Sequence, residues 1–303
     1  MSKVKKLIFI ALVSSILLVT NAFADKRWYV SATLNGMAGK YSESDYRNDL
    51  FSGSAWLNVD YIDVYSVAVA YNNLNVNYTD VGMGSYDINQ ESVAARFQYN
   101  FYNDALGGKI TTQLVAHSVT NDSPLMLSDD VVIVAPKIIY TNYSKTFVID
   151  FEYVYSDYSN NNEFIMEQFS PAIGFGFNKN SDWVQIKAFL IQSSERKFSQ
   201  DEESLTSIKI NWQHEFYSPT LFGINDFFID VLSGERVFAV DNETFSVLNL
   251  EGVQQGSVLF GLGWRVGEDF DVAAVVGTEK YKNKLIDDTY NREHLYISLT
   301  KHW

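Results

Sequence analysis

Few residues in this sequence have the types and spacing needed for bond-making chemistry. The chain of 303 residues has no cysteine and four histidines, so a thiolate nucleophile and a thiolate metal site are excluded. A hydrolase needs a base placed beside a hydroxyl, and the nearest candidate is the run from His117 to Asn121, with Ser118 next to the histidine. The other histidines, His214, His294 and His302, form no spaced cluster. A lone histidine is more often structural, so the sequence gives no catalytic residue and no metal site.

Another group of residues suits electrostatic selection. Positively and negatively charged side chains recur at the polar positions of segments that alternate between polar and apolar residues. Asp60 is one such acidic residue in addition to the candidates named below. Opposed charges around a water-filled path can select among ions and polar solutes. The same charges could instead serve only to solvate a water-filled interior. Both interpretations, selection and solvation, stay open. The candidate pore-lining residues are Arg96, Lys109, Asp150, Glu152, Lys187, Lys209, Asp230, Arg265 and Asp271.

The elements that must position these charges are β-strands. From Trp28 to Asn35 one parity is Trp, Val, Ala and Leu, and the other is Tyr, Ser, Thr and Asn, which predicts a strand with one apolar and one polar face. The same split recurs at 93–101, 147–155, 207–213 and 257–265, and we find no segment of helical period after residue 24. The chain is therefore predicted to be all-β.

Counting such segments predicts about fourteen strands, with 12 or 16 as alternatives. A connection of about 17 residues follows the first strand, and shorter turns then alternate with longer loops. That alternation is typical of a transmembrane antiparallel up-and-down β-barrel with both termini in the periplasm. The predicted strands are 27–36, 54–62, 65–78, 87–102, 108–118, 131–142, 146–156, 165–177, 183–193, 204–216, 226–239, 256–266, 269–281 and 292–303.

Aromatic residues separate this interpretation from a soluble β-sandwich, which also uses strands of period two. A sandwich has no reason to place aromatic rings by position along each strand. In this chain they gather at the predicted periplasmic ends, as the rings of a membrane barrel do at the level of the lipid headgroups. Trp28, Tyr65, Phe147 and Trp183 begin upward strands, and Phe101, Tyr140, Phe177, Trp264 and Trp303 end downward ones.

The first 24 residues read as a signal peptide, and residues 25–303 as the outer-membrane barrel. Lys3, Lys5 and Lys6 precede an apolar run from Leu7 to Val19, and Ala22-Phe23-Ala24 supplies the cleavage pattern. Removing this signal leaves 20 basic residues against 37 acidic ones, a formal charge of −17. A nucleic-acid partner is not expected for so acidic a protein.

The C-terminus resembles the terminal signature of bacterial outer-membrane proteins that the barrel-assembly machinery reads. Leu295, Ile297 and Leu299 alternate up to the aromatic Trp303, while Lys301 departs from the pattern, where the family usually has an apolar or aromatic residue. The resemblance implies export through the periplasm to the outer membrane of a Gram-negative bacterium. It also implies assembly by that machinery and surroundings of outer-membrane lipid and lipopolysaccharide; the oligomeric state stays open.

The architecture looks like that of monomeric porins of the OmpG type, without a motif-level match. It implies a non-enzymatic channel for passive diffusion of small polar solutes or ions, with no cofactor. Acidic loops would favour cations, as at Glu43, Asp45, 129–130, 201–203 and 287–288. The alternatives are a surface or adhesion barrel, a solitary autotransporter-like barrel, and a barrel hydrolase. The hydrolase is disfavoured because the run after His117 lacks the His-x-Ser-Asn-Gly order of outer-membrane phospholipases and lipid A deacylases, and because omptin proteases have ten strands.

Four features do not fit an ideal barrel. Pro136 and Pro171 fall inside predicted strands, where we expect bulges or kinks. The apolar parity switches between Tyr71 and Leu74, which predicts a bulge or a strand that extends above the membrane. The segment 241–255 is apolar for a loop and could fold into the lumen or extend the neighbouring strands; we favour the extension.

Overall fold

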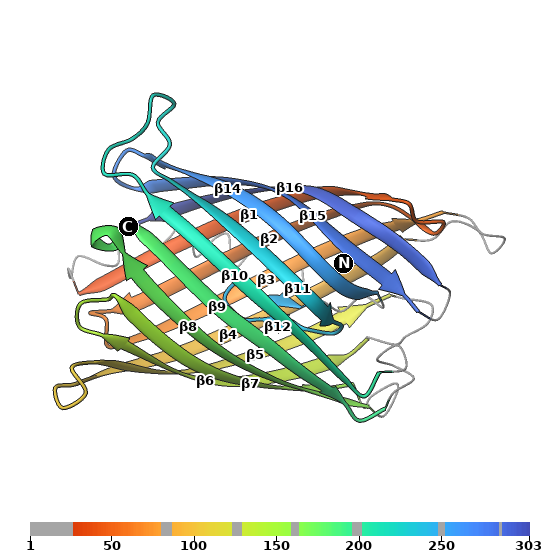
Figure 1. The fold of residues 1–303 in the computed structure, drawn as a ribbon, viewed down its shortest axis with the longest axis horizontal. Coiled ribbons are helices and arrows are strands. Elements are labelled where there is room, and N and C mark those ends of the chain that lie inside the picture. The colour runs from red at the N-terminus through yellow and green to blue at the C-terminus, as the bar shows by residue number, and fades with distance from the viewer. Residues whose placement is uncertain are drawn as a thin grey trace.

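The computed structural model describes residues 27–79, 87–122, 129–158, 164–195, 202–247, 252–284 and 287–303. The predicted signal peptide lies outside the described residues. Fourteen antiparallel strands close into one barrel, in the order β1-β16-β15-β14-β11-β10-β9-β8-β7-β6-β5-β4-β3-β2 (Figure 1). The prediction of a closed up-and-down barrel of fourteen strands is therefore confirmed. Within the described residues, no helix has the length and apolar character to cross a membrane.

The fourteen strands of the barrel wall are 11 to 17 residues long. Their bounds are β1 Trp28–Ser42, β2 Arg47–Tyr61, β3 Tyr65–Tyr78, β4 Asp87–Asn103, β5 Gly108–Asn121, β6 Val131–Asn142, β7 Phe147–Asp157, β8 Ile165–Phe177, β9 Asp182–Ser193, β10 Ser204–Glu215, β11 Asp226–Arg236, β14 Val253–Val266, β15 Phe270–Asn283 and β16 Asp288–His302. The short turn η2, Asn178–Asn180, joins β8 to β9, and two further strands, β12 Val240–Asp241 and β13 Ser246–Val247, form a separate hairpin.

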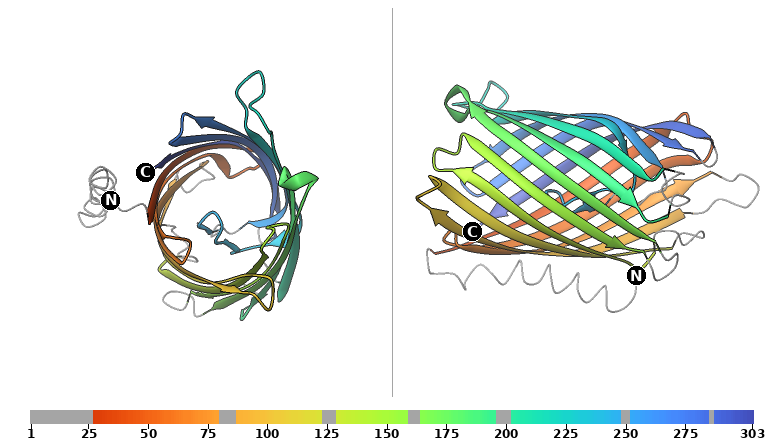
Figure 2. Two further views of the ribbon diagram at one scale, coloured as in Figure 1. Left: turned by 90° about the vertical axis from the view of Figure 1, so that its left-hand side faces the viewer. Right: turned by 60° about the horizontal axis from the view of Figure 1, so that its bottom comes forward.

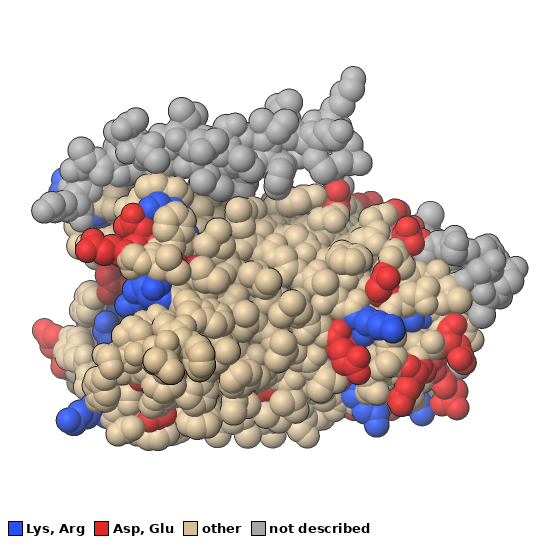
Figure 3. Space-filling view, turned by 90° about the horizontal axis from the view of Figure 1, so that it is seen from above, with Lys and Arg blue, Asp and Glu red and all other residues tan. Residues whose placement is uncertain are grey.

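Period-two alternation separates the two faces of the wall. On β7, Phe151 is 44% exposed on the outer surface, while its neighbours Asp150 and Glu152 are buried on the inside. Successive side chains of a strand point to opposite faces, so the apolar parity forms the outer surface. Figure 3 shows the result on one side of the molecule: the middle of the barrel carries almost no charged atoms, and charges gather at its two ends. Such an outer band suits a lipid bilayer.

The end of the barrel that carries residues 28 and 302 is called here the terminal end, and the opposite one the far end. The strands continue further toward the far end than the sequence predicts. The first connection is not about 17 residues long, because β1 runs to Ser42 and β2 begins at Arg47. The apolar band alone does not set strand length, since backbone pairing continues beyond it where the outer face becomes polar.

The change of parity on β3 has the same cause. Its register with β4 runs without a shift from Tyr65 opposite Tyr99 to Asn77 opposite Asp87, so there is no bulge at 72–73. Near the far end the polar Asn75 lies on the outside, while Leu74 and Val76 turn inward and pack in an internal apolar cluster. Of the two predicted alternatives, the extended strand is right.

The two strand prolines produce neither predicted bulge. Pro136 lies opposite Leu114 of β5, and the pairing of β6 with β7 keeps one register on both sides of the proline. Pro171 likewise lies opposite Phe151. Of the predicted bulges or kinks, the bulges are wrong, since the registers on both sides of each proline are continuous. Each proline lacks an N–H donor toward one neighbouring strand only. The ladder loses the pairs beside it and then resumes in the same register.

Between β11 and β14 the chain leaves the wall, although the two strands pair with each other and keep the barrel closed. Register shifts occur between Ser233 and Arg236 on β11 and between Gln254 and Gly256 on β14. Gly234 has a φ of +101°, and a Cβ on it would lie 2.4 Å from the carbonyl oxygen of Thr206, so only glycine fits this bend. Beyond it the chain turns into the barrel, where β12 and β13 lie inside the ring of strands (Figure 2, left).

Candidate functional site in the barrel lumen

Residues 237–247, called here the lumenal segment, occupy part of the barrel interior. The favoured extension of the strands is therefore wrong for residues 241–247, which turn inward, and right for 253–255, which lengthen β14. Residues 248–251 lie outside the described residues. Val237, Phe238, Val240 and Phe245 of this segment are almost completely buried. They belong to one apolar cluster with inward side chains of β5 to β10, which are Val115, Val119, Val131, Ile133, Ala135, Val154, Met166, Phe189, Ile191 and Leu205. Removing this apolar surface from water holds the segment against that side of the wall.

The tip of the lumenal segment reaches toward strands β2 to β4. The ring of Phe245 lies 5.4 Å from the ring of Trp56 in an edge-on arrangement, and the guanidinium of Arg96 lies 5.1 Å above the Phe245 ring. The side-chain amide of Asn72 donates to the carbonyl oxygen of Phe245 at 3.3 Å. These contacts hold the lumenal segment, which follows β11, against strands β2 to β4 and narrow the lumen.

A buried ionic network joins the lumenal segment to the wall, and Lys187 is its centre. The ammonium group of Lys187, only 1% exposed, lies 3.4 Å from Glu152 of the wall. It also lies 3.7 Å from Asp241 and 3.5 Å from Glu243 of the segment. Because this one cation serves carboxylates of both parts, the segment and the wall depend on each other electrostatically.

Two further lysines extend the network. Lys209 lies 2.7 Å from Asp241 and 3.8 Å from Asp230. Lys137 lies 3.2 Å from Asp150 and 3.4 Å from Glu243. Each lysine therefore has one carboxylate on the wall and at least one on the lumenal segment.

Neutral side chains complete the attachment. Asn242 donates to Glu152 at 2.8 Å, and its side-chain oxygen lies 2.7 Å from Nε2 of His117. The amide of Gln168 is bonded to both the carbonyl oxygen and the N–H of Val240, at 2.8 and 3.0 Å. His117 therefore serves as a structural partner of the segment, and Ser118, its neighbour in sequence, points to the outer face. The two do not form a nucleophile–base pair.

The lumenal segment changes the charge balance of the interior. In this network the wall contributes three lysines and three carboxylates, which cancel; Asp241 and Glu243 then add two negative charges, and Arg236 of β11 offsets one of them. Burial opposes ionisation of Asp241, but Lys209 and Lys187 outweigh it and hold the pKa of that carboxyl well below its usual range. Partial desolvation opposes ionisation of Glu243, but Lys187 and Lys137 outweigh it and lower the pKa of that carboxyl. Both carboxylates are therefore charged at neutral pH.

The structure brings together six of the nine predicted pore-lining residues around the lumenal segment: Arg96, Asp150, Glu152, Lys187, Lys209 and Asp230. The other three lie near the terminal end. Lys109 pairs there with Asp63 at 3.1 Å, and Arg265 with Asp271 at 3.5 Å, both in exposed positions. Sequence reasoning missed Lys137, although it is the one charged residue of β6.

A free space remains beside the lumenal segment. This cavity of about 380 Å³ is bounded on one side by Phe245 and its neighbours. Part of its wall is neutral and polar, with Asn35, Ser52, Ser54 and Ser257, and Glu279 and Arg292 add a buried ion pair. The segment therefore occupies one side of the lumen and leaves a polar space on the other.

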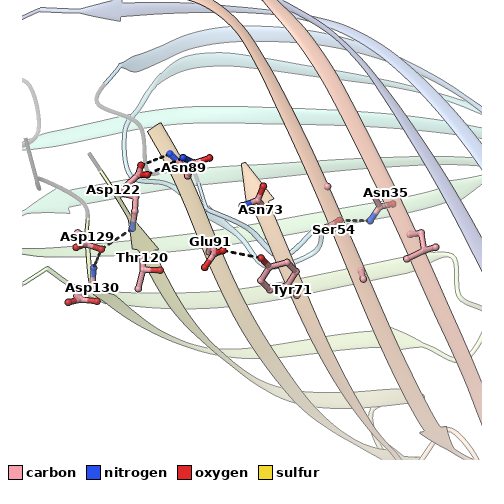
Figure 4. A pocket seen from close by; sticks show the side chains of 14 residues that line it. Asn35, Ser54, Tyr71, Asn73, Asn89, Glu91, Thr120, Asp122, Asp129 and Asp130 are labelled. Atoms are coloured by element: carbon pink, nitrogen blue, oxygen red, sulfur yellow. Dashed lines mark hydrogen bonds between the residues drawn. The ribbon is translucent and has the colours of Figure 1, made fainter. Parts of the chain in front are cut away.

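A larger hollow of about 950 Å³ is lined by residues of β1 to β5 near the far end (Figure 4). Tyr71 donates to Glu91 at 3.3 Å, and both are on the face opposite to the lumenal Asn72. Asn89 donates to Asp122 at 2.6 and 3.0 Å. Among the described residues no group of three or more His, Asp or Glu side chains is arranged to hold a metal ion.

Comparison with known proteins identifies the architecture. One solved structure, described as a bacterial polysaccharide outer membrane secretin, matches with a TM-score of 0.53 at 9% identity, over 90% of this chain and 98% of that one. The fold is that of bacterial outer-membrane β-barrels. At this identity the likeness shows the fold alone. A closed barrel with an apolar outer band satisfies its backbone hydrogen bonds within the bilayer, and its place is the outer membrane.

Two further solved barrels cover nearly the whole chain at lower similarity. Omp33 of Acinetobacter baumannii has a TM-score of 0.46 at 8% identity over 92% of this chain and 100% of that one. OccK7 of Pseudomonas aeruginosa has a TM-score of 0.46 at 7% identity over 93% and 99%. No protein-family model matches the chain, and no curated protein matches it in sequence.

Proposed function

We propose that this protein is a channel for the passive diffusion of small polar solutes or ions across the outer membrane, narrowed by the lumenal segment. The observation that carries the proposal is the polar cavity beside Phe245 in a lumen that side chains do not fill. Eight-stranded barrels are packed with side chains, and those of 16 to 18 strands hold aqueous channels. A barrel of fourteen strands with one infolded segment fits a narrow, wet path.

We further propose that the channel prefers cations. In the narrowed region five carboxylates, among them Asp241 and Glu243, face three lysines and Arg236, which leaves an excess of one carboxylate. Asp129, Asp130 and Glu203 add negative charge near the far end, while Glu202 is paired with Lys284 at 2.8 Å. Charges at the mouth are screened beyond about 8 Å at physiological salt, so Asp241 and Glu243 inside the lumen should weigh more.

The chemistry of the interior supports a non-enzymatic role. His117 is engaged with Asn242, and its neighbour Ser118 faces outward. A barrel that acts only through its surface, as an adhesin or a solitary autotransporter-like barrel, would need no conducting path. Conductance therefore separates the proposed function from these alternatives.

The test is a planar-bilayer recording of the purified protein in KCl. We expect discrete single-channel steps, and a several-fold larger conductance when residues 238–246 are replaced by a short Gly-Ser linker. The reversal potential under a tenfold KCl gradient should indicate cation preference, and the double variant Asp241→Asn, Glu243→Gln should reduce it. Asp287→Asn removes one exposed far-end charge and is the matched control, with a smaller expected shift. A folded barrel that conducts neither with nor without the segment would overturn the channel.

A further inference from the structure

The connection from Phe216 to Asn225, between β10 and β11, differs from the other turns at the terminal end. It has ten residues, whereas the connections 62–64, 104–107, 143–146, 178–181 and 267–269 have three or four. Each of those five contains at least one charged residue, and the sequence from 216 to 225 contains none. Length and composition both set this connection apart.

Its tip exposes three large apolar side chains. Leu221 is 94% exposed, Tyr217 81% and Phe222 80%, while the next most exposed large apolar residue among those described, Tyr29, reaches 60%. Burying a side chain of this size is worth roughly 1.5–3 kcal/mol. Three such side chains on one tip, with no charge beside them, indicate a surface that is covered in the working protein.

The backbone holds this tip in one conformation. Phe216 and Asn225 close its base with a hydrogen bond of 2.8 Å, and Thr220 accepts from the N–H of Gly223 at 2.9 Å. The N–H of Ile224 donates to the hydroxyl of Thr220 at 3.1 Å, and Gly223 has a φ of +73° that glycine adopts without strain. The apolar residues are therefore presented by a formed turn.

The direction of the connection indicates what covers it. It leaves the wall away from the barrel axis, above the strands in Figure 1 and outside their ring in the axial view of Figure 2. Its base continues the aromatic strip of the outer wall: the ring of Phe227 lies 5.9 Å from Phe216, 5.3 Å from Trp212 and 6.4 Å from Phe260. Because Trp212 and Phe260 lie on the outer apolar surface, the strip runs from the membrane-facing wall into the tip.

We propose that Phe216–Asn225 is a membrane anchor whose Tyr217, Leu221 and Phe222 enter the lipid headgroup and upper acyl region of the leaflet at the terminal end. Amphipathic rings and apolar side chains gain free energy at this depth, and charged turns do not. Lipid is the occupant rather than a second protein because the tip extends the membrane-facing surface. This anchor is independent of the channel function.

The absence of cysteine makes the test direct. A single cysteine at Leu221→Cys, labelled with a polarity-sensitive fluorophore, is reconstituted in vesicles of phosphatidylethanolamine and phosphatidylglycerol containing doxyl-labelled lipid. The matched control is Glu268→Cys on the exposed turn 267–269 at the same end. We expect blue-shifted emission and several-fold stronger quenching by doxyl lipid at position 221 than at 268. Heat-modifiable migration confirms that both variants are folded barrels.

Two outcomes would overturn the anchor. Equal, weak quenching at positions 221 and 268 would place the tip in water. A label at 221 that is shielded in native envelopes but exposed in pure lipid vesicles would assign the tip to a protein partner. A Phe222→Cys variant gives a second reading from the same tip.

Discussion

Asn242 donates a hydrogen bond of 2.8 Å to Glu152, although 90 positions separate the two residues in the chain. Glu152 is completely buried in the wall, and the ammonium of Lys187 lies 3.4 Å from its other carboxylate oxygen. The lumenal segment therefore supplies partners that a buried charge of the wall requires. Detaching the segment would therefore also destabilise the wall, because Glu152 would lose a hydrogen-bond partner.

Removing the central cation tests this dependence. Lys187→Met should leave Glu152, Asp241 and Glu243 without their shared partner, and loss of one member of a buried pair costs about 3–5 kcal/mol. We expect a lower temperature for loss of the compact, heat-modifiable form and noisier current traces. Lys109→Met is the control, since its partner Asp63 is exposed and the pair sits at the terminal rim. Equal effects of the two variants would contradict a central role for Lys187.

The carboxylates of the lumenal segment predict how the channel responds to pH. The pKa values of Asp241 and Glu243 are lowered in the folded protein, because the lysines outweigh burial. The stability that these two ionised carboxylates contribute is fully present above their pKa values in the unfolded chain, which are near 4. It is lost as the pH falls through their lower pKa values in the folded protein. Conductance should therefore be constant from about pH 5 to pH 8, with release of the segment below about pH 4. A transition between pH 5 and 8 would instead implicate His117, which contacts Asn242, or His294, which lines the cavity.

The assignment of faces predicts opposite outcomes for neighbouring residues of β10. Ile210 is exposed on the outer surface and Asn211 faces the lumen. Ile210→Arg should cost roughly 2–4 kcal/mol near the bilayer midplane and reduce insertion, while Asn211→Arg should be tolerated. Urea titration of folding into vesicles measures both. Asp150 is unsuitable as a tolerant control because it pairs with Lys137 in the interior.

The C-terminal residue has a structural role beside its predicted role in assembly. The N–H of Trp303 donates to the carbonyl oxygen of Val30 at 3.0 Å, where β16 closes the barrel against β1. Deleting Trp303 should slow folding and leave protease-sensitive periplasmic protein, while Trp303→Phe should assemble normally. Normal levels of folded barrel in the deletion variant would show that the terminal aromatic is dispensable.

Lys301 departs from the C-terminal pattern, and its contacts explain how the barrel accommodates it. Its ammonium lies 4.5 Å above the ring of Phe270 and 2.6 Å from Asp269 in the neighbouring turn. The charged end therefore lies over an aromatic ring and beside a carboxylate of the turn, where a cation is stabilised.

The sequence by itself determined the class of fold. The alternation around Phe151 and Ile210 is enough to predict two-faced strands, because a side-chain period of two is a local property of extended backbone. Fourteen such segments with aromatic ends then allow little other than a closed membrane barrel. Where pairing continued past the apolar band, at Ser42 and Arg47, the local pattern underestimated the strands.

The tertiary structure alone decided what fills the lumen. The partners of Lys187 are Glu152, 35 positions before it, and Asp241 and Glu243, more than 50 positions after it. An apolar, acidic loop has the same local pattern whether it extends two strands or turns inward. The choice depends on the summed burial of Phe238 and Phe245 and on charges from five strands of the wall, and no local window of sequence contains that sum.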